Sequence, residues 1–377
     1  MGVAPRYGID ARWLDVGPPS GRNYVRHVVA ELGRGQDAAD FVVFVRRQRT
    51  GQASRDGVLL PTIEIPDMPA LFFNGLGIPM RTPREVVAVA YQHFTPLRSR
   101  ARRLTIIHDV IYLTSPERFS RLERPYLGLI ARLLPRAEVV AAVSQHVRDQ
   151  VLDRWPKRDP ASVIVAPNGV DARLLSAGAL PREEVDESAE AAARGRLGIN
   201  RPYVLYLGRL NTRKNLPTLI RAFAEAELDD HDLVLAGAPD STVQDLEAIG
   251  RDSKVGGRLR LLGGIADGVL PALLRGADAF AYVSFDEGFG VPPLEAMAFG
   301  IPVVCSDIPA LRETAGPGGA AFIPADDQEA MAGALRSAVL DESVRAAARA
   351  RGPVHARRYR WSTTADRIRA GLRLAAQ

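Results

Sequence analysis

Short apolar runs alternate with longer stretches of mixed polar and apolar residues along the whole chain of 377 residues. Such runs are typical of strands that are buried on both faces, and the stretches between them suit helices. Five runs lie in the first half of the chain and five in the second, at residues 7–10, 41–45, 86–90, 104–107, 139–143, 203–207, 233–236, 259–262, 279–283 and 303–305. This alternation predicts an α/β protein with two doubly wound, Rossmann-like domains.

The segment between the two sets of runs contains no strand pattern and is rich in Ala, Glu and Arg. We therefore place the N-terminal domain at residues 1–175, a linker at 176–198 and the C-terminal domain at 199–356. Ligands of doubly wound sheets bind at the carboxyl ends of the strands, so the cleft between the two domains is the expected active site.

The composition is that of an ordinary globular protein, with 46% apolar and 25% charged residues, so we expect the chain to fold throughout. No apolar run approaches the roughly 20 residues of a spanning helix, and the N-terminus lacks the layout of a signal peptide. These features predict a soluble, cytoplasmic protein. Cys305 is the only cysteine, which excludes an intrachain disulfide and a metal centre built on thiolates.

Positive charge is concentrated in the first domain. The first 170 residues hold 24 Lys and Arg against 16 Asp and Glu, whereas the net charge of the whole chain is only +5. Arginine clusters attract phosphates, anionic lipid surfaces or nucleic acid, although plain solvated surface charge gives the same pattern. We leave peripheral contact with the inner face of an anionic membrane open, and we expect no nucleic-acid partner. The clusters are Arg46, Arg47 and Arg49; Arg98, Arg100, Arg102 and Arg103; and Arg118, Arg121 and Arg124.

The strongest candidate site follows the run at 279–283, where a glycine-containing loop leads into a helix that opens on Pro292 and Pro293. A helix N-terminus offers free backbone N–H groups and a partial positive charge, which suits a diphosphate. Glu287 on the loop and Glu295 in the helix can accept hydrogen bonds from sugar hydroxyls. Together these residues predict a site for a nucleotide-activated sugar.

Residues 287–307, EGFGVPPLEAMAFGIPVVCSD, resemble the signature of the retaining GT-B glycosyltransferases grouped as family 4, which include bacterial mannosyltransferases and sucrose synthases. The resemblance covers nearly the whole chain and is strongest at 203–315. It implies two domains that face each other across a cleft, the acceptor on the first and the nucleotide sugar on the second. A final helix at 357–377 would cross back to the first domain.

The resemblance assigns roles within this loop. It implies that Glu287 contacts the hydroxyls of the donor sugar and helps to stabilise positive charge at the anomeric carbon, and that Glu295 binds the ribose. An ordinary helix-capping loop is the alternative. Backbone groups beside the sugar and the phosphates are expected from Gly288, Phe289, Gly290 and Val291.

Two cations follow the first run of the second domain, Arg209 directly after Gly208, and Lys214 where the next helix opens. Cations placed in this way can clamp a diphosphate while its negative charge grows during departure. The pattern resembles the G-R-x4-K site of the family, which implies that Gly208, Arg209 and Lys214 contact the donor phosphates. Solvated surface charge is the alternative.

The first domain offers two histidines at strand ends. His108 follows the run at 104–107 and resembles the histidine of the family's His-Asp element, which implies a position near the donor sugar and the acceptor. It acts there as a general base or only positions ligands. Asp109 orients this histidine or caps the following turn. His93 also follows a run and is expected on the acceptor side, with a structural role as the alternative for both histidines.

Further donor-binding positions come from the resemblance. Gly21 stands in the loop GPPSGRNY, whose glycine spacing departs from the family pattern, and its amide is expected to approach the phosphate. Asn168 belongs to a P-N-G-V-D loop that matches the family's hinge, where turn formation is the main meaning. The backbone of Ile265 and Ala266 resembles the strand end against which the nucleobase packs.

The resemblance predicts a retaining hexosyltransferase that moves a hexose from a nucleotide-diphosphate sugar to a hydroxyl acceptor, namely a glycan, a lipid-linked molecule or a natural product. No cofactor or metal is expected, because Arg209, Lys214 and the helix end meet the phosphate charge. The triplet Asp230-His231-Asp232 precedes a run and is interpreted as a solvated loop. The alternatives are a nucleotide-sugar epimerase of the same fold and a non-catalytic nucleotide-sugar or nucleic-acid binder.

Overall fold

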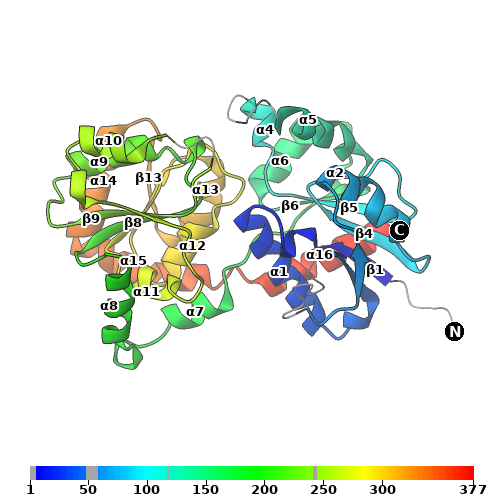
Figure 1. Cartoon of the computed structure of the whole chain (residues 1–377), viewed down its shortest axis with the longest axis horizontal. Coiled ribbons are helices and arrows are strands. Elements are labelled where there is room, and N and C mark those ends of the chain that lie inside the picture. The colour runs from blue at the N-terminus through cyan, green and yellow to red at the C-terminus, as the bar shows by residue number, and fades with distance from the viewer. Residues whose placement is uncertain (1–5, 48–57, 117–118, 120, 122, 241–243) are drawn as a thin grey trace. The chain divides into compact units, whose positions relative to one another are not determined.

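The computed structural model describes residues 6–47, 58–116, 119, 121, 123–240 and 244–377, so that Arg49 and Arg118 of the arginine clusters lie outside the described residues. The chain divides into two compact units. The first unit comprises Met1–Gly169 and Arg360–Gln377, and the second unit comprises Val170–Tyr359. Each unit is a parallel β-sheet with helices packed against it (Figure 1).

The sheet of the first unit has the strand order β3-β2-β1-β4-β5-β6-β7, and neighbouring strands are parallel throughout. The order reverses between β1 and β4, as in other doubly wound sheets, so the residues that end these two strands meet at one edge. The strands are β1 (Arg6–Asp10), β2 (Phe41–Arg46), β3 (Thr62–Ile65), β4 (Val86–Gln92), β5 (Arg102–Ile107), β6 (Val139–Ala142) and β7 (Val163–Val165).

The C-terminal helix belongs to the first unit, as the resemblance implied. This helix, α16 (Trp361–Ala376), packs beside α1 (Pro19–Arg34) and across β4, β5 and β6. Gly371 permits the contact, because a Cβ atom there would lie 2.6 Å from the side chains of Leu104 and Ile164. Further helices of this unit are α2 (Ala70–Phe72), α3 (Ile78–Arg81), α4 (Ile111–Thr114), α5 (Glu123–Leu133) and α6 (Gln145–Arg154).

The sheet of the second unit has the order β10-β9-β8-β11-β12-β13 and is also parallel, with its reversal between β8 and β11. Its strands are β8 (Tyr203–Leu207), β9 (Asp232–Ala236), β10 (Leu259–Gly263), β11 (Ala279–Tyr282), β12 (Val303–Ser306) and β13 (Ala321–Ile323). Its helices include α7 (Ala172–Gly178), α8 (Glu187–Arg196), α9 (Leu216–Glu225), α10 (Leu246–Asp252), α11 (Leu270–Arg275), α12 (Val291–Ala298), α13 (Pro309–Ala315), α14 (Gln328–Leu340) and α15 (Glu342–Ala356).

The sequence pattern did not predict three of the strands, β3, β7 and β13, and all three lie at sheet edges. Each is three or four residues long and has only one fully buried residue. An edge strand that is half exposed lacks the continuous apolar run by which central parallel strands are recognised.

Residues 176–198 are not a linker, contrary to the expectation from their composition. They form the end of α7 and all of α8, which pack in the second unit against α11 and α12. The Nη2 of Arg275 donates to the backbone oxygen of Ala177 at 2.8 Å, and its Nε pairs with Glu190 at 3.1 Å. Ala, Glu and Arg are strong helix formers, and here they build a helix that needs only one side in contact with the unit.

Candidate active site

The loop between β11 and α12 is held in one conformation by a glycine. Gly290, at the N-cap of α12, has φ of +91°, and a Cβ atom there would lie 2.5 Å from Leu311. Thr314 donates a hydrogen bond of 2.9 Å to the backbone oxygen of Phe289, which is buried and packs edge-on against Tyr359. Pro292 and Pro293 have no N–H, so the free backbone donors at the start of α12 are those of Gly290 and Val291, and the ordered loop fixes their position.

Lys214 and Glu287 form a buried ion pair. The ammonium group also donates to the hydroxyl of Tyr282 at 3.0 Å. Burial alone would raise the pKa of Glu287, but the positive charges of Lys214 and Arg213, with hydrogen bonds from Lys214 and Ser284, hold it below its ordinary value. The carboxylate is therefore ionised at neutral pH although it is shielded from water.

The local backbone brings this pair together. The Lys214 turn ends in Asn215, which has φ of +53° and whose amide donates to the backbone oxygen of Ala325 at 2.5 Å. The backbone N–H of Phe285 donates to the oxygen of Arg213 at 2.9 Å, which ties the loop after β11 to the turn after β8. Both side chains thus come from the carboxyl ends of neighbouring strands.

Arg209 pairs with a different carboxylate from that of Lys214. Its Nε is 3.5 Å from a carboxylate oxygen of Asp240, and half of its side chain is exposed. Asp240 follows β9 as Arg209 follows β8, so the adjacency of the two strands explains the contact, and sequence reasoning missed this partner. The strand ends approach so closely that a Cβ atom on Gly237 would lie 1.7 Å from the backbone oxygen of Gly208.

The next strand end carries the expected nucleobase positions. The backbone N–H of Gly237 donates to the oxygen of Gly263 at 2.7 Å, so the ends of β8, β9 and β10 lie in one row. Ile265, two residues further, is half buried, and Ala266 is exposed. A half-buried isoleucine beside an exposed alanine suits a flat, aromatic ligand group.

Glu295 is buried in α12. Burial raises its pKa to about 7, and the nearby negative charges of Asp171 and Asp267 add to the effect. Asp171 caps α7 and binds the guanidinium group of Arg173 at 2.7 Å, and Arg173 is also 3.8 Å from Asp267. The acidic neighbours of Glu295 were not predicted, because they come from other elements of the unit.

In the first unit, His108 is enclosed by aromatic rings. The ring centres of Tyr24, Trp13 and His93 lie 4.8, 5.5 and 6.2 Å from its own. Burial, assisted by His93, lowers the pKa of His108 to about 3. Its Nε2 is shielded from solvent, and the described residues offer it no hydrogen-bond partner. The imidazole is therefore neutral at physiological pH.

His93 and Asp109, the two titratable neighbours of His108, differ in their structural roles. His93 adopts the left-handed backbone conformation, with φ of +61°, and burial lowers its pKa against the raising effect of the Asp109 charge. The carboxylate of Asp109 accepts from the backbone N–H of Ile111 at 3.2 Å. Of the two expectations for Asp109, capping of the following turn is the one for which the structure shows a hydrogen bond.

Gly21 makes room for Trp13. A Cβ atom on Gly21, in the first turn of α1, would lie 2.3 Å from the indole ring, so the ring packs directly against the backbone of this turn. Asn168 lies in a loop pinned to α16, since Thr364 donates to the oxygen of Pro167 at 2.5 Å. The Oδ1 atom of Asn168 is buried and has no partner among the described residues.

A buried carboxylate at the end of β1 was missed by the sequence reasoning. Asp10 accepts hydrogen bonds from the side chain of Asn74 at 3.0 Å and from the backbone N–H groups of Arg12 and Gln92 at 3.1 and 3.2 Å. Burial raises its pKa against these contacts and the charge of Arg12. The available signal was a single acidic residue that ends an apolar strand.

The interpretation of Asp230-His231-Asp232 as a solvated loop was wrong for its last residue. Asp232 is fully buried as the first residue of β9, and its carboxylate lies 3.1 Å from Arg260 and 3.8 Å from Arg201. The two arginines compensate the buried charge.

Comparison with known proteins gives the family. The profile described as Glycosyl transferases group 1 matches residues 189–354. The chain is 30% identical to the O-antigen chain mannosyltransferase B of Escherichia coli over 272 residues, which are 69% of this chain and 67% of that protein. It is 33% identical to the phosphatidyl-myo-inositol mannosyltransferase of Mycolicibacterium smegmatis over 170 residues, 44% of this chain and 43% of that protein.

Solved structures match over the whole length. The Anabaena protein HepE, in complex with UDP and glucose, has a TM-score of 0.73 at 19% identity and covers 98% of this chain and 99% of its own. WaaG, a glycosyltransferase involved in lipopolysaccharide biosynthesis, has a TM-score of 0.72 at 15% identity, with coverage of 97% and 98%.

Two parallel sheets with this arrangement define the GT-B fold, as predicted. The chain belongs to the family Glycosyl transferases group 1. It is thus a glycosyltransferase, which confirms the enzyme class expected from the sequence. Among the helices of the described residues, none combines the length and the apolar character needed to cross a bilayer.

Proposed function

We propose that this chain transfers a hexose, with mannose the first candidate, from a nucleotide-diphosphate sugar to a hydroxyl acceptor with retention of the anomeric configuration. The observation that carries the proposal is the buried pair of Lys214 and Glu287 beside the N-terminus of α12. Both relatives reported above are named mannosyltransferases, which favours mannose as the sugar.

The second unit binds the donor. Lys214, Arg209 and the N–H groups of α12 meet the diphosphate, so no metal ion is required for its charge. The ionised carboxylate of Glu287 accepts hydrogen bonds from the sugar hydroxyls and stabilises positive charge at the anomeric carbon. Glu295 binds the ribose hydroxyls, and Ile265 and Ala266 lie at the nucleobase. The remaining donor contacts are backbone groups of Gly208, Gly288, Phe289, Gly290 and Val291.

The first unit binds the acceptor, and His93, His108 and Asp109 are the candidate acceptor residues; Gly21 and Asn168 are kept as candidate donor contacts. The acceptor oxygen forms a bond to the anomeric carbon while the bond from that carbon to the phosphate oxygen breaks. The acceptor proton passes to the departing phosphate on the same face, and Lys214 and Arg209 stabilise the negative charge that develops there. The neutral ring of His108 positions the sugar or the acceptor.

We also propose that the enzyme works at an anionic membrane surface, where a lipid-linked acceptor is available. Free glycans and natural products are the other acceptor classes.

Proton NMR of the purified product tests the proposal. The transferred sugar should keep the anomeric configuration of the donor, and turnover should persist in excess chelator. An inverted linkage would refute retention, and activity restored only by manganese would refute the metal-free site. Interconversion of the donor without an acceptor would instead identify an epimerase.

A further inference from the structure

An apolar ridge is exposed on the first unit, on the helical segment between β3 and β4 that runs through α2, the π-helical turn η3 (Phe73–Gly77) and α3. Phe73 and Ile78 face inward and join a hydrophobic core with Ile65. The other side of the same segment carries Phe72 and Leu76, 50% and 54% exposed. Buried contacts explain the inner side of this segment but not the outer one.

The ridge extends beyond these two residues. Met80, one helical turn after Leu76, is 80% exposed, and Leu97 on the loop after β4 is 57% exposed. Leu76 and Met80 line a hollow of about 300 Å³ together with Arg98 and Arg100 of that loop. We call Phe72, Leu76, Met80, Leu97, Arg98 and Arg100 the apolar–basic face.

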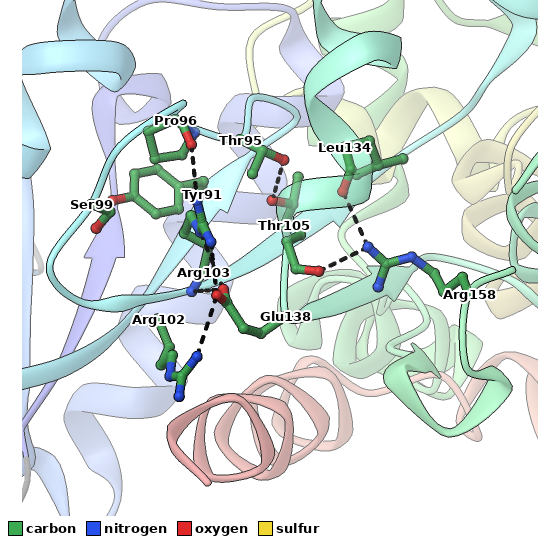
Figure 2. A network of polar contacts seen from close by, with 11 residues as sticks. Tyr91, Thr95, Pro96, Ser99, Arg102, Arg103, Thr105, Leu134, Glu138 and Arg158 are labelled. Carbon is green, nitrogen blue, oxygen red and sulfur yellow. Dashed lines mark hydrogen bonds and ion pairs between the residues drawn. The ribbon is translucent and has the colours of Figure 1, made fainter.

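The loop after β4, which carries Leu97, Arg98 and Arg100, is held by hydrogen bonds to β4 and β5 (Figure 2). Arg103, itself bound to Glu138 at 2.8 Å, reaches the backbone oxygen of Pro96 at 3.5 Å. Tyr91 and Ser99 are in hydrogen-bond distance at 3.5 Å, and Thr95 and Thr105 at 2.8 Å. Leu97, Arg98 and Arg100 therefore protrude from a loop whose backbone is already ordered.

The charge of the face is uncompensated. Arg98 and Arg100 are exposed, and neither has an acidic partner within the part of the chain that the structure describes. The carboxylates that flank the helical segment are engaged elsewhere, since Asp67 pairs with Arg46 and Glu85 with Arg6. Exposed apolar side chains beside unpaired arginines are the combination that suits a surface of acidic lipids.

We propose that the apolar–basic face docks on the surface of an anionic lipid membrane. Phe72, Leu76, Met80 and Leu97 insert among the lipid headgroups, while Arg98 and Arg100 bind lipid phosphates. This inference rests on the membrane location proposed above but not on the transferase reaction, so a failure to bind vesicles would leave the proposed sugar transfer standing.

Vesicle sedimentation with the full chain is the test. The protein should sediment with vesicles of phosphatidylcholine containing phosphatidylglycerol and not with phosphatidylcholine alone, and high salt should weaken the binding. An arginine near an anionic surface strengthens partition about fivefold, so R98E/R100E should weaken it by at least about 25-fold. L76S/M80S should weaken it about tenfold or more, because two apolar side chains lose their burial in the lipid.

Matched variants on the second unit control for charge and apolarity. R221E/R251E changes two exposed arginines, and L340S/V354S replaces residues that are 58% and 55% exposed. Both should bind like the wild type. Equal binding to the two kinds of vesicle, or unchanged binding of R98E/R100E and L76S/M80S, would overturn the proposal. A wild-type dimer that L76S/M80S dissociates, without vesicle binding, would assign the face to a second copy of the chain instead.

Discussion

Lys214 and Glu287 are 73 residues apart in the sequence and form one buried ion pair, which joins the turn after β8 to the loop after β11. Each side chain compensates the charge of the other inside the unit. The same two groups are proposed to meet the phosphates and the sugar of the donor, so stability and function depend on the same contact.

Removing one partner should leave a buried charge unpaired. We expect K214M or E287Q to lower the free energy of unfolding of the second unit by about 3–5 kcal/mol, and K214M/E287Q to lower it by less than the sum. Urea unfolding followed by circular dichroism measures this. Tryptophan fluorescence does not, because Trp13, Trp155 and Trp361 all lie in the first unit. R312A, which breaks the exposed pair with Asp307, should change the midpoint little, and additive single effects would contradict the prediction.

Glu295 should make the second unit less stable as the pH rises. Its pKa is about 7 in the folded chain, against an ordinary value of 4.5, so the folded state binds more protons between these two pH values. Stability from this group is full below pH 4.5 and is lost as the pH approaches 7, a change of about 3 kcal/mol. The difference in the free energy of unfolding between E295Q and wild type, measured by urea unfolding at pH 5, 6, 7 and 8, should show this dependence on pH. E247Q, on an exposed glutamate, should not, and parallel curves for E295Q and wild type would disprove the shift.

His108 should not titrate in the physiological range. With a pKa of about 3 in place of 6.5, its ring stays neutral in the folded chain, and it opposes folding only as the pH falls from 6.5 toward 3. The histidine NMR signal that is absent from H108Q should keep its chemical shift between pH 5 and 8. Acid unfolding of the first unit, followed by tryptophan fluorescence, should be less steep in H108Q. A titration midpoint near 6.5 would contradict the enclosure of the ring.

The start of α12 should depend on a glycine. G290A forces an alanine into φ of +91° and against Leu311, and we expect it to destabilise the second unit by about 1–3 kcal/mol and to weaken donor binding. G333A is the control, since Gly333 lies within α14 and a Cβ atom there meets nothing within 4 Å. That variant should be neutral or slightly more stable. Equal effects of the two variants in thermal unfolding and donor titration would argue against the role of Gly290.

The central strands of both sheets could be predicted because burial on both faces leaves a continuous apolar run. The same argument fails at β3, β7 and β13, where exposure interrupts the run. It also fails at α8, whose composition shows a helix but not the surface on which it packs. Patterns in the sequence report burial, whereas the order of strands and the docking of helices come from tertiary contacts.

The candidate site shows the same division. Glu287, Lys214, Arg209 and His108 could be chosen because each stands near the end of an apolar run, in a motif that resembles one of the family. Their partners could not, because Asp240 meets Arg209 only through the adjacency of β8 and β9. Asp171 and Asp267 act on Glu295 from other elements of the unit. The sequence thus selected single residues for the candidate site, and the structure adds the electrostatic surroundings that set their protonation.

The placement of α16 has a consequence for synthesis on the ribosome. The first unit is interrupted by Val170–Tyr359 and is completed only by Arg360–Gln377, whose helix covers β4, β5 and β6. The two ends of the interrupting segment lie side by side, since the backbone N–H of Val170 donates to the oxygen of Tyr359 at 3.0 Å. The second unit is therefore an insertion whose two ends are adjacent. It can finish folding before the last helix of the first unit has been translated.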